Sequence, residues 1–302
     1  MSADNLVGRT VAGYHLAKYI GEGGTATVYR AEHAERGESA VKILRPRLAG
    51  DPVAVKRFLR EAEFGSRVRH PNIVRTYDYG ESDGLHYLAL EWATGEPLAE
   101  FVNRSGRLAP PLVGVIVEQL GAALTVAHRA GIIHRDLKTA NIMYDPATQK
   151  AKILDFGIAR DSEASPEERL TRAGFFVGTL QYVAPETLSG ELVSEQADVY
   201  SLATITYYLL TQEHPFTGKN PRELFQQLLT QPPVPLNQAV RGLKFPAAVE
   251  AAVMRGLERD LSKRCKTVDE FARGFCTAAQ MEVPGKKAGF LASLFRKGGA
   301  GS

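Results

Sequence analysis

Two short motifs and the distance between them constrain this chain more than any other feature. Residues 134–141 read His-Arg-Asp-Leu-Lys-Thr-Ala-Asn, and Asp155 opens the triplet Asp-Phe-Gly fourteen residues after Asn141. Transfer of a phosphoryl group requires an acceptor for a hydroxyl proton, oxygen ligands for a metal ion and cations directed at the phosphates. Asp136, Lys138, Asn141 and Asp155 are the residue types that supply these parts. The two motifs, in this order and at this spacing, predict a site for that chemistry.

A glycine-rich run lies upstream of both motifs. Residues 20–29 read Ile-Gly-Glu-Gly-Gly-Thr-Ala-Thr-Val-Tyr. Taken alone, such a run is most often an ordinary hairpin turn. Glycine also lets backbone N–H groups approach phosphate oxygens with no Cβ in the way. We therefore take Gly21, Glu22, Gly23 and Gly24 as candidates for phosphate binding. Ala26 stands where a third glycine is usual, and it should stiffen the tip of the turn.

A single lysine interrupts the apolar run at residues 40–44, thirteen residues after Tyr29. Lys42 could simply extend its charged end into solvent from a strand. With the downstream motifs present, it is the expected cation for the phosphates of a nucleotide.

The partner of that lysine is expected on the next helix. Asp51 followed by Pro52 favours a helix start there, since Asp caps free N–H groups and Pro fits the first turn. At about 100° per residue, Glu61 lies nearer than Glu63 to the apolar face of this helix. Glu61 is therefore the predicted partner, and Gly65 should weaken the helix by about 1 kcal/mol relative to alanine.

Residues 178–186 read Gly-Thr-Leu-Gln-Tyr-Val-Ala-Pro-Glu and complete a set of motifs that occurs in one family. The chain resembles the protein kinases, and among them the bacterial serine/threonine kinases called Hanks-type or eukaryotic-like. The resemblance covers about residues 8–280, and no motif position lacks its required residue type. It implies an α+β, bilobal fold. We expect an N-lobe at 1–92 with an antiparallel sheet and one key helix, a mainly helical C-lobe at 93–281, and a basic, partly apolar tail at 282–302.

The resemblance also implies roles for individual residues. Asp136 would accept the proton of the substrate hydroxyl, Lys138 would stabilise transferred charge, and Thr179 would help to seat the hydroxyl. Lys42, held by Glu61, would position ATP. Asn141 and Asp155 would hold Mg²⁺, with Mn²⁺ as an alternative. The full set expected around the nucleotide is Gly21, Glu22, Gly23, Gly24, Val28, Ala40, Lys42, Leu90, Glu91, Ala93 and Met143; for Val28, Ala40 and Met143 a plain core role stays open.

Three further expectations follow from the resemblance. Glu186 should form a buried, structural ion pair with Arg264, and Asp198 should brace the backbone of the 134–141 segment. Thr171, seven residues before Gly178, should be autophosphorylated, which adds a charge of about −1.5 to −2 near Arg135.

Composition agrees with a two-lobed enzyme of the cytoplasm. A chain of 302 residues with 44% hydrophobic content suits two lobes. Two cysteines, eleven residues apart, argue against a disulfide framework or a Cys-rich zinc site and suit a reducing compartment. The N-terminus lacks the features of a signal peptide, and we expect no membrane span. Four of the 37 basic residues are the only charges in residues 284–302, which leaves 33 basic against 34 acidic residues elsewhere. We therefore expect no nucleic-acid partner.

The partners predicted for this chain are proteins that carry Ser or Thr, because Lys138 favours Ser/Thr over Tyr specificity. Self-association for trans-autophosphorylation is a further expectation. In the tail, Phe290, Leu291, Leu294 and Phe295 share one helical face, which suits either a self-docked tail or weak contact with a membrane surface. Two other functions stay open: a pseudokinase-like or phosphorylation-gated scaffold that binds ATP and partner proteins, and a small-molecule kinase. The intact Lys42, Asp136, Asn141 and Asp155 argue against a pseudokinase. Residues 178–186 and the form of the 134–141 motif argue against a small-molecule kinase, whereas a phosphorylation-gated docking role stays open.

Overall fold

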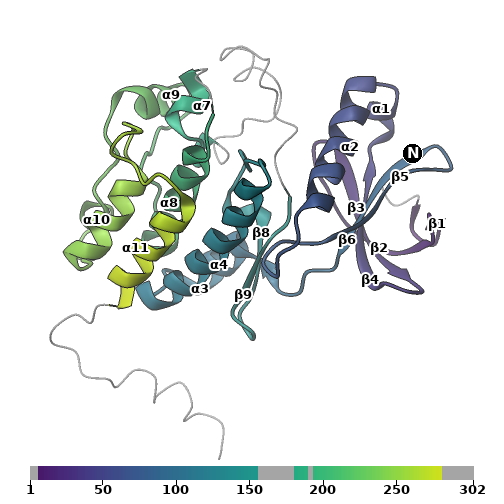
Figure 1. Ribbon diagram of the computed structural model, residues 1–302, viewed down its shortest axis with the longest axis horizontal. Helices are drawn as coiled ribbons and strands as arrows, with labels where there is room; N and C mark the ends of the chain where they lie inside the picture. Colours follow the sequence, from purple (N-terminus) through teal and green to yellow (C-terminus); the bar gives the residue numbers. More distant parts are fainter. Residues whose placement is uncertain (1–5, 156–179, 190–192, 281–302) are drawn as a thin grey trace, which may run out of the picture.

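The computed structural model describes residues 6–155, 180–189 and 193–280, which form two lobes (Figure 1). The first lobe is built on a six-stranded antiparallel sheet with the order β1-β2-β3-β4-β6-β5. Its strands are β1 (Thr10–Val11), β2 (Tyr14–Glu22), β3 (Ala26–His33), β4 (Gly37–Leu44), β5 (Thr76–Ser82) and β6 (Leu85–Glu91). Between β4 and β5 lie the key helix α2 (Pro52–Arg67) and a short helix that the sequence did not predict, α1 (Pro46–Ala49).

The helix α2 begins where the sequence predicted. The side chain of Asp51 accepts a hydrogen bond of 2.9 Å from the backbone N–H of Val53, and Pro52 lies in the first turn. Gly65 is buried, and a Cβ at this position would lie 2.7 Å from Oγ1 of Thr76 in β5. The glycine that lowers the helix propensity of α2 therefore also permits its close approach to the sheet.

The two faces of this sheet carry separate apolar clusters. On the side of α2, the buried residues are Ala26, Leu44, Phe58, Ala62, Val74, Leu88 and Leu90. The opposite face holds Val11, Tyr14, Leu16, Tyr29, Ala31, Val41, Ile43, Tyr87 and Ala89. Because side chains alternate along a strand, Lys42 points to the α2 side while Val41 and Ile43 point away from it.

The second lobe is mainly helical. Its elements are the small sheet β7 (Glu96–Pro97), β8 (Ile142–Asp145) and β9 (Lys150–Ile153), and the helices α3 (Leu98–Ser105), α4 (Pro110–Arg129), α7 (Pro185–Ser189), α8 (Gln196–Thr211), α9 (Pro221–Thr230), α10 (Ala247–Gly256) and α11 (Val268–Gln280). One-turn 3-10 helices occur at Thr139–Asn141 and Leu236–Gln238. Nearly all of α8 is buried, so it forms the centre of the lobe. These lobes confirm the expected α+β bilobal fold, while the limits at residues 92 and 281 stay predictions.

The composition of helix α4 bears on the expectation that the chain has no membrane span. Within the described ranges, α4 is the one helix that is long and apolar enough, by length and composition, to cross a membrane. Val113, Ile116, Val117 and Leu120 on this helix are fully buried in the lobe. Its apolar composition is therefore explained by packing against α8 and α11.

Two of the contacts between the lobes, within the described residues, involve the backbone. The linker after β6 passes directly over β8, since Gly95 has φ 93° and a Cβ there would lie 2.2 Å from the carbonyl oxygen of Tyr144. The second contact is made by the segment between α2 and β5. There the amide nitrogen of Asn72 donates to the carbonyl of Ala151 and to Oε1 of Gln119, both at 2.7 Å.

Candidate active site

Lys42 lies at the centre of the first lobe's sheet, in register with Val28 of β3 and Leu88 of β6. Its Nζ lies 3.5 Å from Oε1 of Glu61 on α2 and also forms an ion pair with Asp155. Glu63 instead forms an exposed ion pair with Arg67, one turn along the same helix. The structure therefore contains the predicted contact between Lys42 and Glu61, and it adds Asp155 to the same cluster.

The charges of Asp155 and Glu61 are compensated to different extents by Lys42. Burial opposes the charge on Lys42, but Asp155 and Glu61 outweigh it and hold the pKa of Lys42 above its ordinary value. Burial raises the pKa of Glu61 to about 7, and the negative charges of Asp155 and Asp136 reinforce that shift against the attraction of Lys42. Because Lys42 pairs more closely with Asp155, Glu61 is the carboxylate that is only partly compensated.

Asp136 is held by two neighbours from its own segment. Nδ2 of Asn141 donates to the carbonyl oxygen of Asp136 at 3.0 Å and to its Oδ2 at 3.3 Å. Nζ of Lys138 lies 3.1 Å from the same Oδ2. The backbone N–H of Leu154 donates to the carbonyl of Asn141 at 2.9 Å, which joins this segment to the strand end that carries Asp155. The four residues of the two motifs are thus brought into one site.

A buried aspartate anchors the backbone of the segment. Asp198 on α8 accepts hydrogen bonds from the N–H of His134 at 2.8 Å and of Arg135 at 3.0 Å, and from Nε2 of His128 at 2.7 Å. Burial alone would raise the pKa of Asp198, but these bonds hold it below its ordinary value. Arg135 has φ 64°, a left-handed conformation that costs a non-glycine residue about 1 kcal/mol or more and must be held by its surroundings. The predicted bracing contact of Asp198 is therefore present.

The neutral form of His134 is part of this anchoring. Burial lowers the pKa of His134, and its Nδ1 accepts a hydrogen bond of 3.3 Å from the N–H of Asp136. The imidazole thereby helps to set the backbone that presents the Asp136 carboxylate.

The glycine-rich turn has the space that a phosphate group requires. A Cβ built at Gly21 or at Gly24 meets no atom within 4 Å, and one at Gly23 lies 3.6 Å from the carbonyl of Ala26. None of these three glycines has a positive φ. Their backbone could therefore be adopted by other residues, and the feature that only glycine provides here is open space beside the peptide groups.

The residues expected around the adenine lie at the junction of the lobes. Val28, Ala40 and Met143 are half-buried, whereas Leu90 is buried against α2. Ala93 packs against the same cluster. The apolar side chains that line an open binding cleft remain partly exposed. The half-buried state of Val28, Ala40 and Met143 therefore fits the expected role of these positions.

The side chain of Glu91 is held by two groups, one of which the sequence did not point to. Its Oε1 pairs with Lys152 of β9, and its Oε2 accepts a hydrogen bond of 3.2 Å from the N–H of Arg75. Lys152 lies between the buried residues Ala151 and Ile153. The alternation of lysines with buried apolar residues in β9 was the available signal, but nothing in the sequence identified the partner of Lys152.

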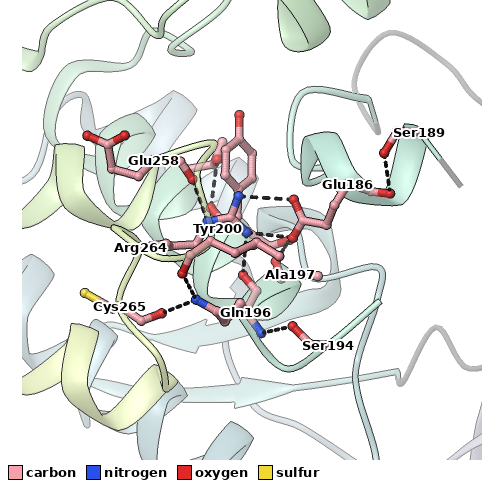
Figure 2. Close-up of polar contacts among 12 residues, drawn as sticks. Glu186, Ser189, Ser194, Gln196, Ala197, Tyr200, Glu258, Arg264 and Cys265 are labelled. Atoms are coloured by element: carbon pink, nitrogen blue, oxygen red, sulfur yellow. Dashed lines mark hydrogen bonds and ion pairs between the residues drawn. The ribbon is translucent and has the colours of Figure 1, made fainter. Parts of the chain in front are cut away.

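A buried arginine joins separate segments of the second lobe (Figure 2). Nη1 and Nη2 of Arg264 contact Oε1 and Oε2 of Glu186 at 2.6 and 3.1 Å. Arg264 also donates to the carbonyls of Glu258 at 2.7 Å and Gln196 at 2.9 Å, and its guanidinium lies 5.1 Å from the ring centre of Tyr200. The predicted structural pair is present and joins α7, α8 and the segment before α11.

Several predictions fall outside the described residues. Thr171, Thr179 and the Phe-Gly pair after Asp155 lie within residues 156–179, and the predicted C-terminal tail, 282–302, lies beyond the last described residue, Gln280. The predictions made for them stay predictions.

The residues at the motif junction fit a divalent cation. Asn141 donates its amide nitrogen to Asp136, so its amide oxygen is turned away from that residue. This oxygen and the carboxylate of Asp155 form the oxygen-donor pair that hard cations such as Mg²⁺ prefer.

Known proteins share both the sequence and the fold. A model of the protein kinase domain matches residues 14–279. Serine/threonine-protein kinase pkn3 of Myxococcus xanthus is 36% identical over 275 residues, which cover 89% of this chain and 50% of pkn3. PknB of Mycobacterium tuberculosis is 37% identical over 276 residues, covering 90% of this chain and 44% of PknB. The chain thus spans about half the length of these curated relatives.

Solved structures lead to the same family. The crystal structure of the Mycobacterium tuberculosis PknI kinase domain aligns with a TM-score of 0.69 and 29% identity, covering 90% of this chain and 98% of that one. Rad53, solved in complex with AMP-PNP, aligns with a TM-score of 0.71 and 26% identity over 87% of this chain and 65% of Rad53. The motifs and two lobes of this chain, together with these relatives, show that it belongs to the protein kinase family.

Proposed function

We propose that this chain is a serine/threonine protein kinase that transfers the γ-phosphoryl group of ATP to hydroxyl groups of proteins. The observation that carries the proposal is that the contacts around Asp136 are joined to the contact between Lys42 and Asp155. Asp136, held by Lys138 and Asn141, is joined through the Leu154–Asn141 backbone hydrogen bond to the segment whose Asp155 contacts Lys42. A proton acceptor, metal ligands and two cations in one site are what phosphoryl transfer requires.

Each residue would act through its own polar atoms. Oδ2 of Asp136 would accept the proton of the attacking hydroxyl, and Nζ of Lys138, 3.1 Å from that oxygen, would stabilise charge on the transferred group. Lys42 would direct its ammonium group at the nucleotide phosphates while Glu61 holds its position. Asn141 and Asp155 would hold Mg²⁺, which when bound neutralises charge on the phosphates.

Regulation and location are further parts of the proposal. Arg135 is held at the 134–141 segment by Asp198, and a phosphate on Thr171 would supply an anion for its guanidinium. Such phosphorylation between two copies of the chain would require self-association. Cys265 and Cys276 are both free thiols, which suits a protein that works in the cytoplasm.

The experiment is to incubate purified protein with Mg-ATP and a generic Ser/Thr protein substrate and to map phosphosites by mass spectrometry. Asp136→Asn is the matched control, because it keeps the shape of the side chain and removes the proton acceptor. We expect phosphate on the substrate and on Thr171 with the wild type only. A mixture of wild type and Asp136→Asn should place phosphate on Thr171 of the variant if the reaction occurs between two copies.

Two results would contradict the proposal. ATP binding with no phosphoryl transfer to substrate or to the chain itself would favour a scaffold. Equal transfer by the wild type and by Asp136→Asn would show that Asp136 is not the proton acceptor. Replacing Mg²⁺ by Mn²⁺ in the same assay tests which cation the site uses.

A further inference from the structure

The tip of the glycine-rich turn is tied to the segment that follows β4. The guanidinium of Arg45 donates to the carbonyl of Gly23 at 3.2 Å, and that of Arg47 donates to the carbonyl of Gly24 at 3.1 Å. The backbone N–H of Arg45 donates to the carbonyl of Thr25 at 2.9 Å. Three successive carbonyl groups of the turn therefore accept hydrogen bonds from residues 45–47. We call these contacts the arginine latch.

An ion pair strengthens the latch at its base. Nη2 of Arg45 lies 2.5 Å from Oε1 of Glu22, the last residue of β2. The side chains of Arg45 and Glu22 are 26% and 30% exposed, so solvent screens the pair in part. Arg45 thus contacts the end of β2 and the turn, while its backbone continues from β4.

The latch determines where the N–H groups of the turn point. In a trans peptide the C=O of one residue and the N–H of the next point in opposite directions. The carbonyls of Gly23 and Gly24 point toward the arginines, so the N–H groups of Gly24 and Thr25 point away from them. These are successive backbone donors beside the open space at Gly24, the arrangement that binds anions.

The latch also reduces the entropy that the turn would lose on binding a nucleotide. Glycine loses more conformational freedom on ordering than any other residue, and the turn contains two glycines in succession. A turn that had to be ordered by the nucleotide would lose part of the binding free energy to that ordering. Contacts with residues of the chain itself, such as those of Arg45 and Arg47, would reduce that loss.

We propose that Arg45 and Arg47 are positioning residues for the nucleotide, which hold the glycine-rich turn so that the N–H groups of Gly24 and Thr25 face the phosphates. The proposal rests on the proposed ATP-dependent function, but it assigns a role to two residues outside the family motifs. Arg45 and Arg47 act through the backbone of the turn, not by touching the reacting atoms.

The test compares a ligand that has phosphates with one that has none. Dissociation constants for Mg-AMP-PNP and for adenosine are measured by calorimetry for the wild type and for Arg45→Met/Arg47→Met. The double variant loses the two side-chain hydrogen bonds to Gly23 and Gly24, each of modest net strength. We therefore expect it to bind AMP-PNP about 10-fold more weakly than the wild type. Adenosine, which does not reach the turn, should bind with an affinity within about two-fold of wild type, which also shows that the variant is folded.

Two more variants separate hydrogen bonding from general charge. Arg36→Met removes an arginine at the opposite end of β3 and β4 and should leave both affinities unchanged. Arg45→Lys keeps the charge, but one ammonium group cannot reproduce the fork that reaches both Gly23 and Glu22. It should therefore weaken AMP-PNP binding nearly as much as Arg45→Met does, whereas wild-type affinity in Arg45→Lys would overturn the proposal in favour of simple charge attraction.

Hydrogen exchange of the nucleotide-free protein gives an independent reading. Amides of residues 21–27 should exchange faster in the double variant than in the wild type and in Arg36→Met. Unchanged exchange, or AMP-PNP affinity within two-fold of wild type, would overturn the latch. Failure of the wild type to bind either ligand would instead refute the ATP-dependent function, and the exchange rates would still decide whether the latch orders the turn.

Discussion

Replacing Arg264 by methionine should destabilise the second lobe severely. Arg264 is fully buried and Glu186 is 5% exposed, so the substitution leaves a carboxylate without its partner in the interior. The carbonyls of Glu258 and Gln196 lose their donor in the same step, and Tyr200 loses the guanidinium beside its ring. Removing one member of a buried ion pair costs about 3–5 kcal/mol. At roughly 2–4 °C per kcal/mol for a domain of this size, the expected loss of Tm is roughly 6–20 °C.

The measurement is reversible urea unfolding followed by far-UV circular dichroism. A second variant, Arg264→Met/Glu186→Met, replaces both charges by apolar groups and should recover much of the loss, because no uncompensated charge remains. Arg273→Met, which removes an exposed arginine paired with Asp269, should cost less than about 1 kcal/mol. A loss below about 1 kcal/mol in Arg264→Met, or a double variant as unstable as the single one, would refute the reasoning.

Three further predictions follow from the structure. Gly95→Ala should lower the free energy of unfolding, measured in urea, by at least about 2 kcal/mol, because its Cβ would lie 2.2 Å from the Tyr144 carbonyl oxygen. Gly106→Ala should lower it less, because Gly106 has φ 79° but no atom lies within 4 Å of the Cβ position. Burial lowers the pKa of His214 to about 4, below its unfolded value of 6.5, so its contribution to stability is complete above pH 6.5 and falls as pH drops toward 4. His214→Phe should flatten this part of the plot of urea midpoint against pH, and an unchanged plot would contradict the assignment. The pKa of Glu61 is about 7, so kcat/KM for ATP should rise with pH through 7 as its carboxylate ionises, and Glu61→Gln should lack this step.

The contacts that the sequence predicted well are those between residues with a fixed local geometry or a family motif. Helical periodicity was sufficient to choose Glu61 over Glu63, because α2 has one buried face. The pairing of Glu186 with Arg264 came from the resemblance alone, since 78 residues separate the two and no periodicity relates them. Asp198 was found in the same way.

The contacts that the sequence did not predict mostly end on backbone groups. Arg45 and Arg47 bind carbonyls of Gly23 and Gly24, and every residue has a carbonyl, so such a partner has no signature in the sequence. Length and composition alone do not distinguish the core helix α4 from a membrane span. Apolar composition records that a helix avoids water, and burial inside a lobe meets that requirement as well as a lipid bilayer does.

Two contacts between the lobes bear on how the site can open. A rotation of the first lobe about the line through the Gly95 crossing and the Asn72 contacts would keep both of these contacts, whereas other rotations would break one of them. Asp155 follows Ile153, whose N–H donates to the carbonyl of Asn72, by only two residues and so lies within about 7 Å of one end of this line. The glycine-rich turn lies at the far end of β2 and β3 and has a longer lever arm. A small rotation would therefore carry the turn across a wide arc while the metal-binding carboxylate hardly moves.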